Sequence, residues 1–291
     1  MVDWKKEYRP CPVCGSESRK LLGSRGGKAH RDGLGEETKI AKCRSCTAFY
    51  GYPTLVPQSN PYEAEADYFH IHDHQEKIDN GSELIKQAET ILGRSGSILE
   101  IGCGRGETLL AAKNRGWDVQ GVEMTEQFAE LASSLGVPVE VASAESCSAL
   151  DNKYDVILLS AVLEHLYAPV DILRRIHSAL VPGGLVFVDV PNEGSLGFVL
   201  GELYLKPRGW SMHLSPTFSP FHVVGFSPKS LSRALALADL NVHEMQLVKY
   251  TNVLPGGSVL RNLERLAMGT IQRIGVMIGK PDGIVAWARK A

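Results

Sequence analysis

The chain has 291 residues, of which 44% are hydrophobic and 22% charged, and its formal net charge is −2 at pH 7. These values are typical of a globular protein with one large domain, alone or with a small module, and they give no overall basic field for nucleic acid or an anionic membrane. The first residues lack the apolar stretch of a signal peptide, and no run of about 18 apolar residues would span a bilayer. We therefore expect a cytoplasmic protein whose six cysteines are thiols or metal ligands rather than disulfides.

Residues 8–50 contain two Cys-x-x-Cys pairs. The four cysteines are Cys11, Cys14, Cys43 and Cys46. Two such pairs are the usual ligand set of a structural zinc ion, and the long glycine-rich stretch between them predicts a ribbon with an extended loop. Two unrelated thiol pairs, or a redox disulfide, are the alternative. Because the set leaves no open coordination position, we expect zinc to hold together a module too small to fold on its own core.

The proline-rich stretch 51–61 is predicted to be a linker, so that residues 1–58 form the ribbon module with its linker and residues 59–291 the main domain. A cluster of three histidines follows at His70, His72 and His74. On a strand all three would share a face, and on a helix only the first and the third. We favour a polar helix across the mouth of the site over a second metal centre, because no thiolate or second cluster completes a ligand set.

From residue 82 onward, apolar stretches with the period of a helix alternate with short, nearly continuous apolar stretches. The expected helices are 82–93, 108–113, 125–135, 169–180, 227–240 and 258–278, and the expected strands are 98–101, 118–122, 137–141, 154–159, 185–190, 241–250 and 282–288. Strict alternation predicts an α/β fold with a parallel, doubly wound sheet. The irregular stretch 191–226 and the insert 251–281 are expected to form the substrate pocket.

The first strand leads through a glycine-rich turn, residues 102–106, into a helix. Glycines allow positive φ and a close approach of ligand to backbone at the carboxyl edge of the sheet. The spacing is G-x-G-x-G, and Glu107 stands where dinucleotide-binding proteins have their third glycine. A glutamate at this helix start disfavours a pyrophosphate, so the turn predicts a nucleoside ligand without phosphates. Glu123, at the end of the second strand, is placed to accept hydrogen bonds from both ribose hydroxyls.

Together with Ser143-Ala144-Glu145, Leu163-Glu164-His165-Leu166 and the Pro-Gly-Gly turn of residues 180–185, these motifs resemble class I S-adenosylmethionine-dependent methyltransferases over residues 82–190. The chain is most similar to the subgroup of ubiquinone-pathway O-methyltransferases and bacterial sugar or natural-product methyltransferases, some of which carry an N-terminal Cys-x-x-Cys zinc module. The resemblance implies a Rossmann-like seven-stranded sheet, parallel with an antiparallel last strand at residues 283–289, plus a small zinc ribbon. It also implies S-adenosylmethionine as cofactor beside the structural Zn²⁺.

The resemblance further implies which residues contact the cofactor. They are Glu100, Gly102, Cys103, Gly104, Gly106, Glu123, Met124, Ala144, Glu145 and Ser160. Gly102 and Gly104 would approach the amino-acid portion, and Glu100 would position its amino group through the turn. Met124 would pack on the adenine, whose edge Ala144 and Glu145 would flank, and Ser160 would lie near the methionine part. Glu123 would bind the ribose, and we expect no chemical role for the small side chain of Cys103.

The sulfonium already activates the methyl group, so the protein mainly aligns an acceptor at about 3–3.5 Å, and a hydroxyl acceptor also needs a base. A histidine suits that role, and the candidates are His165, His213 and His222. His222 precedes Gly225-Phe226-Ser227-Pro228, which resembles a His…Phe-Ser-Pro segment beside the acceptor in related enzymes. His165, with Glu164, lies in a motif found at the cofactor pocket, so a packing role is its alternative.

We therefore expect methyl transfer to a hydroxyl oxygen of a small molecule, such as a sugar or natural product, with no membrane partner and with a homodimer left open. One alternative is an RNA methyltransferase whose ribbon grips nucleic acid, although the net charge and the few basic clusters with aromatics speak against it. Another is a non-enzymatic S-adenosylmethionine-binding protein, because an intact glycine turn and Glu123 establish binding but not turnover. The acceptor itself is not identified by the sequence.

Overall fold

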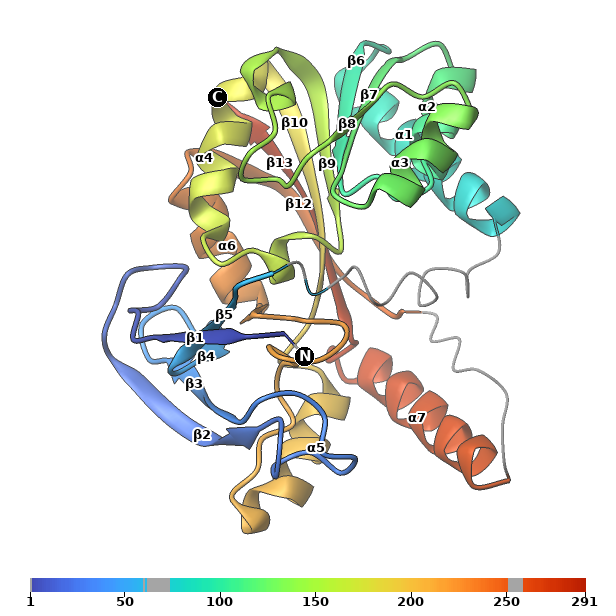
Figure 1. Ribbon diagram of the computed structural model, residues 1–291. Helices are drawn as coiled ribbons and strands as arrows, with labels where there is room; N and C mark the ends of the chain where they lie inside the picture. Colours follow the sequence, from blue (N-terminus) through green and yellow to red (C-terminus); the bar gives the residue numbers. More distant parts are fainter. Residues whose placement is uncertain (1, 60, 62–73, 251–258) are drawn as a thin grey trace.

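The computed structural model describes residues 2–59, 61, 74–250 and 259–291 (Figure 1), with side chains in α7 described from residue 266. The strands are β1 Trp4–Glu7, β2 Arg19–Arg25, β3 Thr38–Cys43, β4 Phe49–Gly51, β5 Thr54–Pro57, β6 Ser97–Ile101, β7 Asp118–Glu123, β8 Val139–Val141, β9 Tyr154–Ser160, β10 Leu180–Pro191, β11 Val224–Gly225, β12 Leu240–Val248 and β13 Gly283–Lys290. The α-helices are α1 His74–Leu92, α2 Glu107–Asn114, α3 Glu126–Ser134, α4 Pro169–Ala179, α5 Leu196–Leu205, α6 Pro228–Ala236 and α7 Val259–Met277, with short 3₁₀ turns η2 Ala149–Asp151, η3 Leu163–His165 and η4 Lys206–Arg208. None of the described helices is both long and apolar enough to cross a membrane.

Seven strands form the main sheet, in the order β12-β13-β10-β9-β6-β7-β8. The pairs from β10 to β8 are parallel, and β13 runs antiparallel to both β10 and β12. The central strand β9 is buried along six of its seven residues, which is why its sequence is almost continuously apolar. This sheet confirms the expected α/β architecture and its antiparallel last strand.

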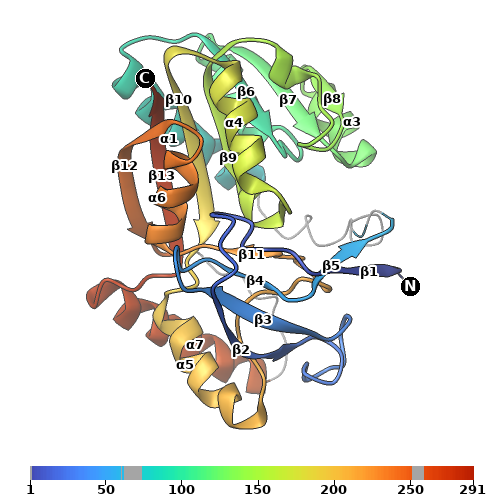
Figure 2. The same ribbon diagram turned by 90° about the vertical axis from the view of Figure 1, so that its left-hand side faces the viewer.

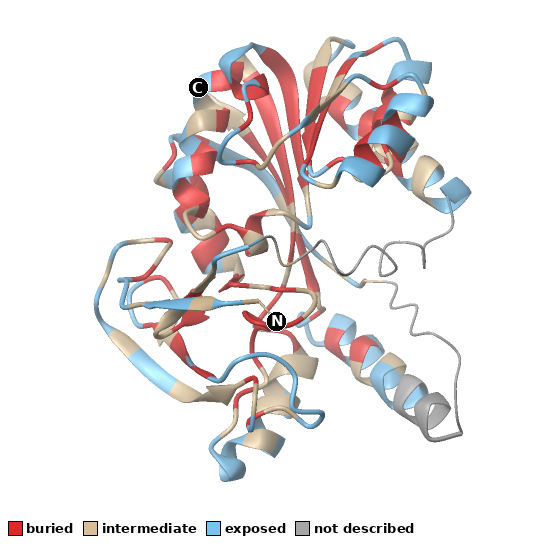
Figure 3. Ribbon diagram, viewed as in Figure 1, coloured by how far each residue is buried: buried red, intermediate tan, exposed pale blue. Residues whose placement is uncertain are grey.

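Helices cover both faces of the sheet, with α1, α2 and α3 grouped on one side and α4 and α6 on the other (Figure 1). The first group packs around Ile85, Leu109 and Trp287, and the second around Ile176 and Leu231. Both apolar layers are buried, as the red sheet in Figure 3 shows. The carboxyl ends of the parallel strands all point toward a second group of elements, below the sheet in Figure 1.

This lower lobe is built from two stretches that are far apart in sequence. Strands β2, β3 and β4 form an antiparallel sheet, and β11 adds a fourth strand beside β4 (Figure 2). Backbone hydrogen bonds also join Ser24 to Gly209 and Ser211, at 2.8 and 2.9 Å. Strand pairing and backbone hydrogen bonds therefore join the N-terminal ribbon to the insert after β10.

Several expectations about individual elements are wrong. The predicted linker 51–61 contains β5, which pairs with β1, and the irregular stretch 191–226 contains α5 and β11. Helix α5 is apolar all round, so its sequence has no amphipathic period that would predict a helix. The Pro-Gly-Gly turn is a bulge within β10, which begins at Leu180 rather than at residue 185.

Candidate functional site

The three glycines of the turn after β6 serve two different purposes. All three have positive φ, which favours glycine. A Cβ at Gly104 would meet no atom within 4 Å, so its surface is open, and Gly102 and Gly104 both line a cavity. A Cβ at Gly106 would lie 2.8 Å from Cβ of Ala132 on α3, and Gly106 is not among the cavity-lining residues. Gly106 therefore allows α2 and α3 to pack closely, and the predicted contact with cofactor rests on the other two.

Glu123 lies at the end of β7 with its carboxylate fixed by the backbone. One oxygen accepts a hydrogen bond from the N–H of Gly104 and the other from the N–H of Thr125, both at 2.9 Å. The residue is only 7% exposed, yet it lines the same cavity as the turn. Each carboxylate oxygen has a second lone pair, so Glu123 can still accept two hydroxyl hydrogen bonds from a ligand.

Glu107, the first residue of α2, is buried and contacts Arg105 and His74. Arg105 Nη2 lies 2.6 Å from its carboxylate and His74 Nδ1 lies 3.1 Å from it. His70 and His72 lie outside the described residues, so the histidine cluster is described only at His74. A negative side chain in this position agrees with a ligand that carries no phosphate near the helix start.

A single cavity of about 950 Å³ extends from the glycine turn to the lower lobe. Its lining includes nine of the ten predicted cofactor residues, all except Gly106: Glu100, Gly102, Cys103, Gly104, Glu123, Met124, Ala144, Glu145 and Ser160. Ligand pockets commonly measure roughly 300–1,000 Å³, so this one has room for a nucleoside cofactor together with a second molecule. Burial raises the pKa of the Glu100 carboxyl to about 8, and the same desolvation strongly raises the pKa of the Cys103 thiol.

Beyond Ser160, the cavity is lined by His165 and His222, which form a cluster with the buried Glu164. One ligand atom of each residue lies within 4.8 Å of the others, and the two imidazole rings are 4.9 Å apart. Two backbone contacts bring the distant segments together: Val223 N–H donates to Glu164 O at 2.9 Å, and His165 Nδ1 lies 3.3 Å from Phe221 O. Two of the three candidate bases thus meet at the cavity wall.

Burial decides the charge of this cluster. It lowers the pKa of His165 to about 4 and that of His222 to about 3, and raises the pKa of Glu164 to about 8. Neither carboxylate oxygen of Glu164 has a hydrogen-bond partner among the described residues, and the nearest imidazole nitrogen, His222 Nε2, is 3.9 Å away. At neutral pH both imidazoles are therefore uncharged. The buried Glu164 carboxyl lies near them without a hydrogen bond to any described residue.

Asp189 and Tyr250 also lie in this region, although neither was predicted from the sequence. Asp189 pairs with Ser160 across the carboxyl ends of β10 and β9 and lines the cavity. The Tyr250 hydroxyl donates a short hydrogen bond to it. Burial raises the pKa of Asp189, and the bond from Tyr250 partly opposes this shift. An acidic residue interrupting a buried apolar strand was a usable indication for Asp189, whereas nothing in the sequence indicates Tyr250.

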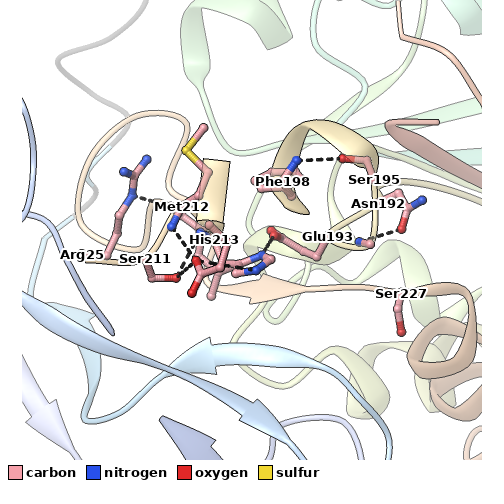
Figure 4. Close-up of polar contacts among 12 residues, drawn as sticks. Arg25, Asn192, Glu193, Ser195, Phe198, Ser211, Met212, His213 and Ser227 are labelled. Atoms are coloured by element: carbon pink, nitrogen blue, oxygen red, sulfur yellow. Dashed lines mark hydrogen bonds and ion pairs between the residues drawn. The ribbon is translucent and has the colours of Figure 1, made fainter. Parts of the chain in front are cut away.

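The third candidate base, His213, lies in the lower lobe and does not line the cavity. Its Nδ1 is 2.6 Å from Glu193, and its ring stacks on Phe49 of β4 and Phe198 of α5 (Figure 4). Its side chain is 7% exposed. This contact set joins the end of β10, helix α5 and the ribbon, so the geometry favours a structural role over proton transfer.

The four cysteines converge as the ribbon prediction requires. Their sulfur atoms lie within 4.8 Å of one another, with Cys11 and Cys46 3.5 Å apart and Cys14 and Cys43 3.6 Å apart. A tetrahedral zinc ion with Zn–S bonds of about 2.3 Å separates its sulfurs by about 3.8 Å. The donor set and its spacing therefore fit a zinc ion, and all six cysteines of the chain are free of disulfides.

Known proteins share both the sequence family and the fold. The family model of a methyltransferase domain matches residues 70–245. The ubiquinone biosynthesis O-methyltransferase of Aeromonas salmonicida (strain A449) is 31% identical over 163 residues, or 53% of this chain and 66% of that protein. The enzyme of the same name from Pseudomonas aeruginosa (strain UCBPP-PA14) is 31% identical over 125 residues, or 38% and 54%. The chain thus spans less than two thirds of the length of these relatives.

Solved structures agree at the level of the fold. The plantazolicin methyltransferase BpumL, solved in complex with SAH, has a TM-score of 0.51 at 17% identity, covering 80% of this chain and 91% of that one. A SAM-dependent methyltransferase from Archaeoglobus fulgidus has a TM-score of 0.50 at 18% identity, covering 73% and 94%. With a family match over more than half of its length and the seven-stranded sheet in place, the chain belongs to the methyltransferase-domain family.

Proposed function

We propose that this enzyme transfers the methyl group of S-adenosylmethionine to a hydroxyl oxygen of a small molecule, such as a sugar or natural product. The observation that carries the proposal is the continuity of one cavity from Gly104 and Glu123 to His165 and His222. A cofactor held at the first pair would present its methyl group toward the second. The bound cofactor supplies an activated methyl group, and the protein's residues align the acceptor and remove its proton.

His222 is our first choice of base, with His165 second and His213 last. His222 lines the cavity in its neutral form, and the buried Glu164 carboxyl stands 3.9 Å from its Nε2. His165 also lines the cavity, and its Nδ1 lies 3.3 Å from the Phe221 carbonyl oxygen. Asp189, beside Ser160, is a further acceptor group in reach of the same space.

A divalent cation on Glu164, His165 and His222 is a second way to activate a hydroxyl. Two imidazoles and a carboxylate are a common ligand set, and the unpartnered oxygens of the buried Glu164 favour it. The effect of a chelator on activity distinguishes a bound cation from a histidine base. Activity that a chelator abolishes and a divalent cation restores would favour the cation, and chelator-resistant activity the base.

The test is methyl transfer from isotopically labelled S-adenosylmethionine to a panel of sugars, phenols and bulk RNA. We expect labelled small-molecule product, an SAH affinity unchanged in His222→Gln, and a kcat reduced at least about 100-fold in that variant. His243→Gln, an exposed histidine of β12, is the matched control and should behave as wild type. Label only on RNA, with steeply salt-dependent binding, would favour the RNA alternative, and SAH binding without any turnover the non-enzymatic one.

We further propose that Cys11, Cys14, Cys43 and Cys46 hold one structural zinc ion and that the enzyme acts in the cytoplasm. The support is the convergence of four sulfurs and the absence of disulfides among the six cysteines, all of which are described. We keep residues 1–58 as the proposed ribbon module and 59–291 as the proposed catalytic domain, with the two joined by β11.

A further inference from the structure

The N-terminal hairpin of the ribbon reaches the cavity of the methyltransferase domain. Strand β1 pairs with β5 in antiparallel register, and Trp4 stands opposite Pro57. Directly opposed residues of an antiparallel pair project from the same face. Both residues line the cavity, and Trp4 is half-buried there. The ribbon therefore supplies part of the cavity wall.

Trp4 faces a wall of rings contributed by the insert after β10. Its ring centroid lies 6.5 Å from that of Phe221, with the ring planes inclined by 30°. Pro216 and Pro220 line the cavity beside Phe221. The same Phe221 holds His165 through its carbonyl oxygen. Phe221 and the candidate base His222 are thus adjacent in the sequence, and both line the cavity.

One hydrogen bond and the continuity of the chain fix the hairpin in place relative to Glu164, His165 and His222. The Tyr167 hydroxyl donates to the carbonyl of Leu55 in β5, at 2.9 Å, and Tyr167 follows His165 by two residues. Strand β1 continues within a few residues to Cys11 in the cysteine cluster. The position of Trp4 is consequently set from both sides, by the cysteine cluster and by the segment that carries His165.

We propose that Trp4 is an acceptor-positioning residue, and that the acceptor carries a ring with a flat apolar face that packs against Trp4 beside the Phe221 wall. This inference rests on the proposed function and adds to it the residue that holds the acceptor. A large rigid aromatic side chain buries a ring at little cost in conformational entropy, and stacked rings gain stability beyond the area that they bury. The flat face orients the ring, and its hydroxyl can then point toward the cavity space shared by His165 and His222.

The experiment measures binding of 4-nitrocatechol, a flat hydroxylated ring, to the full chain saturated with SAH. We expect saturable binding to wild type, at least about tenfold weaker binding to Trp4→Ala, and binding within about threefold of wild type for Trp4→Phe. The control is Tyr8→Ala, an aromatic residue next to the same hairpin that is 72% exposed and does not line the cavity. It should bind the probe as wild type does. The SAH affinity should be the same in all four proteins, which shows that each is folded.

Unchanged probe affinity in Trp4→Ala would overturn the role of this residue, and absence of saturable binding to wild type would overturn the ligand class. A loss of probe affinity in Tyr8→Ala equal to that in Trp4→Ala would also overturn the proposal, because it would assign the effect to the hairpin as a whole. The proposed reaction is judged separately. Probe that binds through Trp4 but receives no labelled methyl group would count against the choice of acceptor atom and leave the positioning role supported.

Discussion

Replacing Glu123 by alanine tests the cofactor site most directly. The carboxylate is held by the N–H groups of Gly104 and Thr125, so it is preorganised to accept the two ribose hydroxyls. A hydrogen bond to a charged group contributes about 1.5–3 kcal/mol, so losing two would cost about 3–6 kcal/mol before solvent compensates. We expect a net loss of about 3 kcal/mol, which corresponds to SAH binding about 150-fold more weakly.

The assay is isothermal titration of SAH into wild type, Glu123→Ala, Glu123→Gln and the control Glu126→Ala. Glu126 carries the same charge three residues away on the exposed first turn of α3, so its variant should bind as wild type. The glutamine variant keeps one oxygen and should fall between wild type and alanine. Thermal unfolding of each variant separates a local loss of binding from a collapse of the turn. If Glu123→Ala binds SAH as tightly as wild type while remaining folded, the assignment of the cofactor site is wrong.

Three further predictions concern groups whose environment the fold fixes. At pH 7 the Glu100 carboxyl, with its pKa raised by burial to about 8, is mostly protonated, and a cofactor ammonium beside it would lower that pKa and release a proton. The heat of SAH binding should therefore vary with the ionisation enthalpy of the buffer in wild type but not in Glu100→Gln. The same buffer dependence in both proteins would contradict the placement of the cofactor ammonium beside Glu100. We expect elemental analysis to find zinc in wild type and in Cys147→Ser, whose cysteine lies outside the cluster, but not in Cys14→Ser. The Cys14→Ser variant should also unfold at a lower temperature. Wild type without zinc would refute the ribbon assignment. Burial alone would raise the pKa of Asp155, but Arg94 and Ser97 hold it below its usual value, so the stability it adds is present above its unfolded pKa of about 4 and is lost as pH falls. Urea unfolding should show Asp155→Asn about 1–3 kcal/mol less stable at pH 7 and nearly equal to wild type near pH 2, and a difference independent of pH would contradict this reasoning.

The sheet was predictable because its strands and helices carry strong local patterns. Strand β9 is apolar along its length, and α6 begins at Ser227 with a reciprocal capping box to Ser230. The β10 bulge and α5 were missed for local reasons as well. A glycine pair within a strand resembles a turn, and a helix that is apolar all round has no amphipathic period.

The cofactor-binding residues that we propose come from one motif and the end of the next strand, so a local sequence pattern was enough to propose them. The acceptor half depends on contacts between distant segments. His222 meets Glu164 only because Val223 bonds to the backbone of η3, and Trp4 meets Phe221 only because β1 is held by β5. Periodicity and spacing describe neighbours along the chain, so they place His165 shortly after a strand but leave its partners undetermined.

The core itself joins the ribbon to the catalytic domain. Cys11, Cys46 and Tyr50 belong to the same buried apolar cluster as Ile176 of α4 and Leu231 of α6. Removing the ribbon would expose this surface and leave β11 without its partner β4, and β11 begins only two residues after His222. A truncated chain that begins after residue 58 would therefore keep the glycine turn and Glu123 yet lose the support of His222. For this reason, an N-terminal deletion should impair acceptor turnover more than it impairs SAH binding.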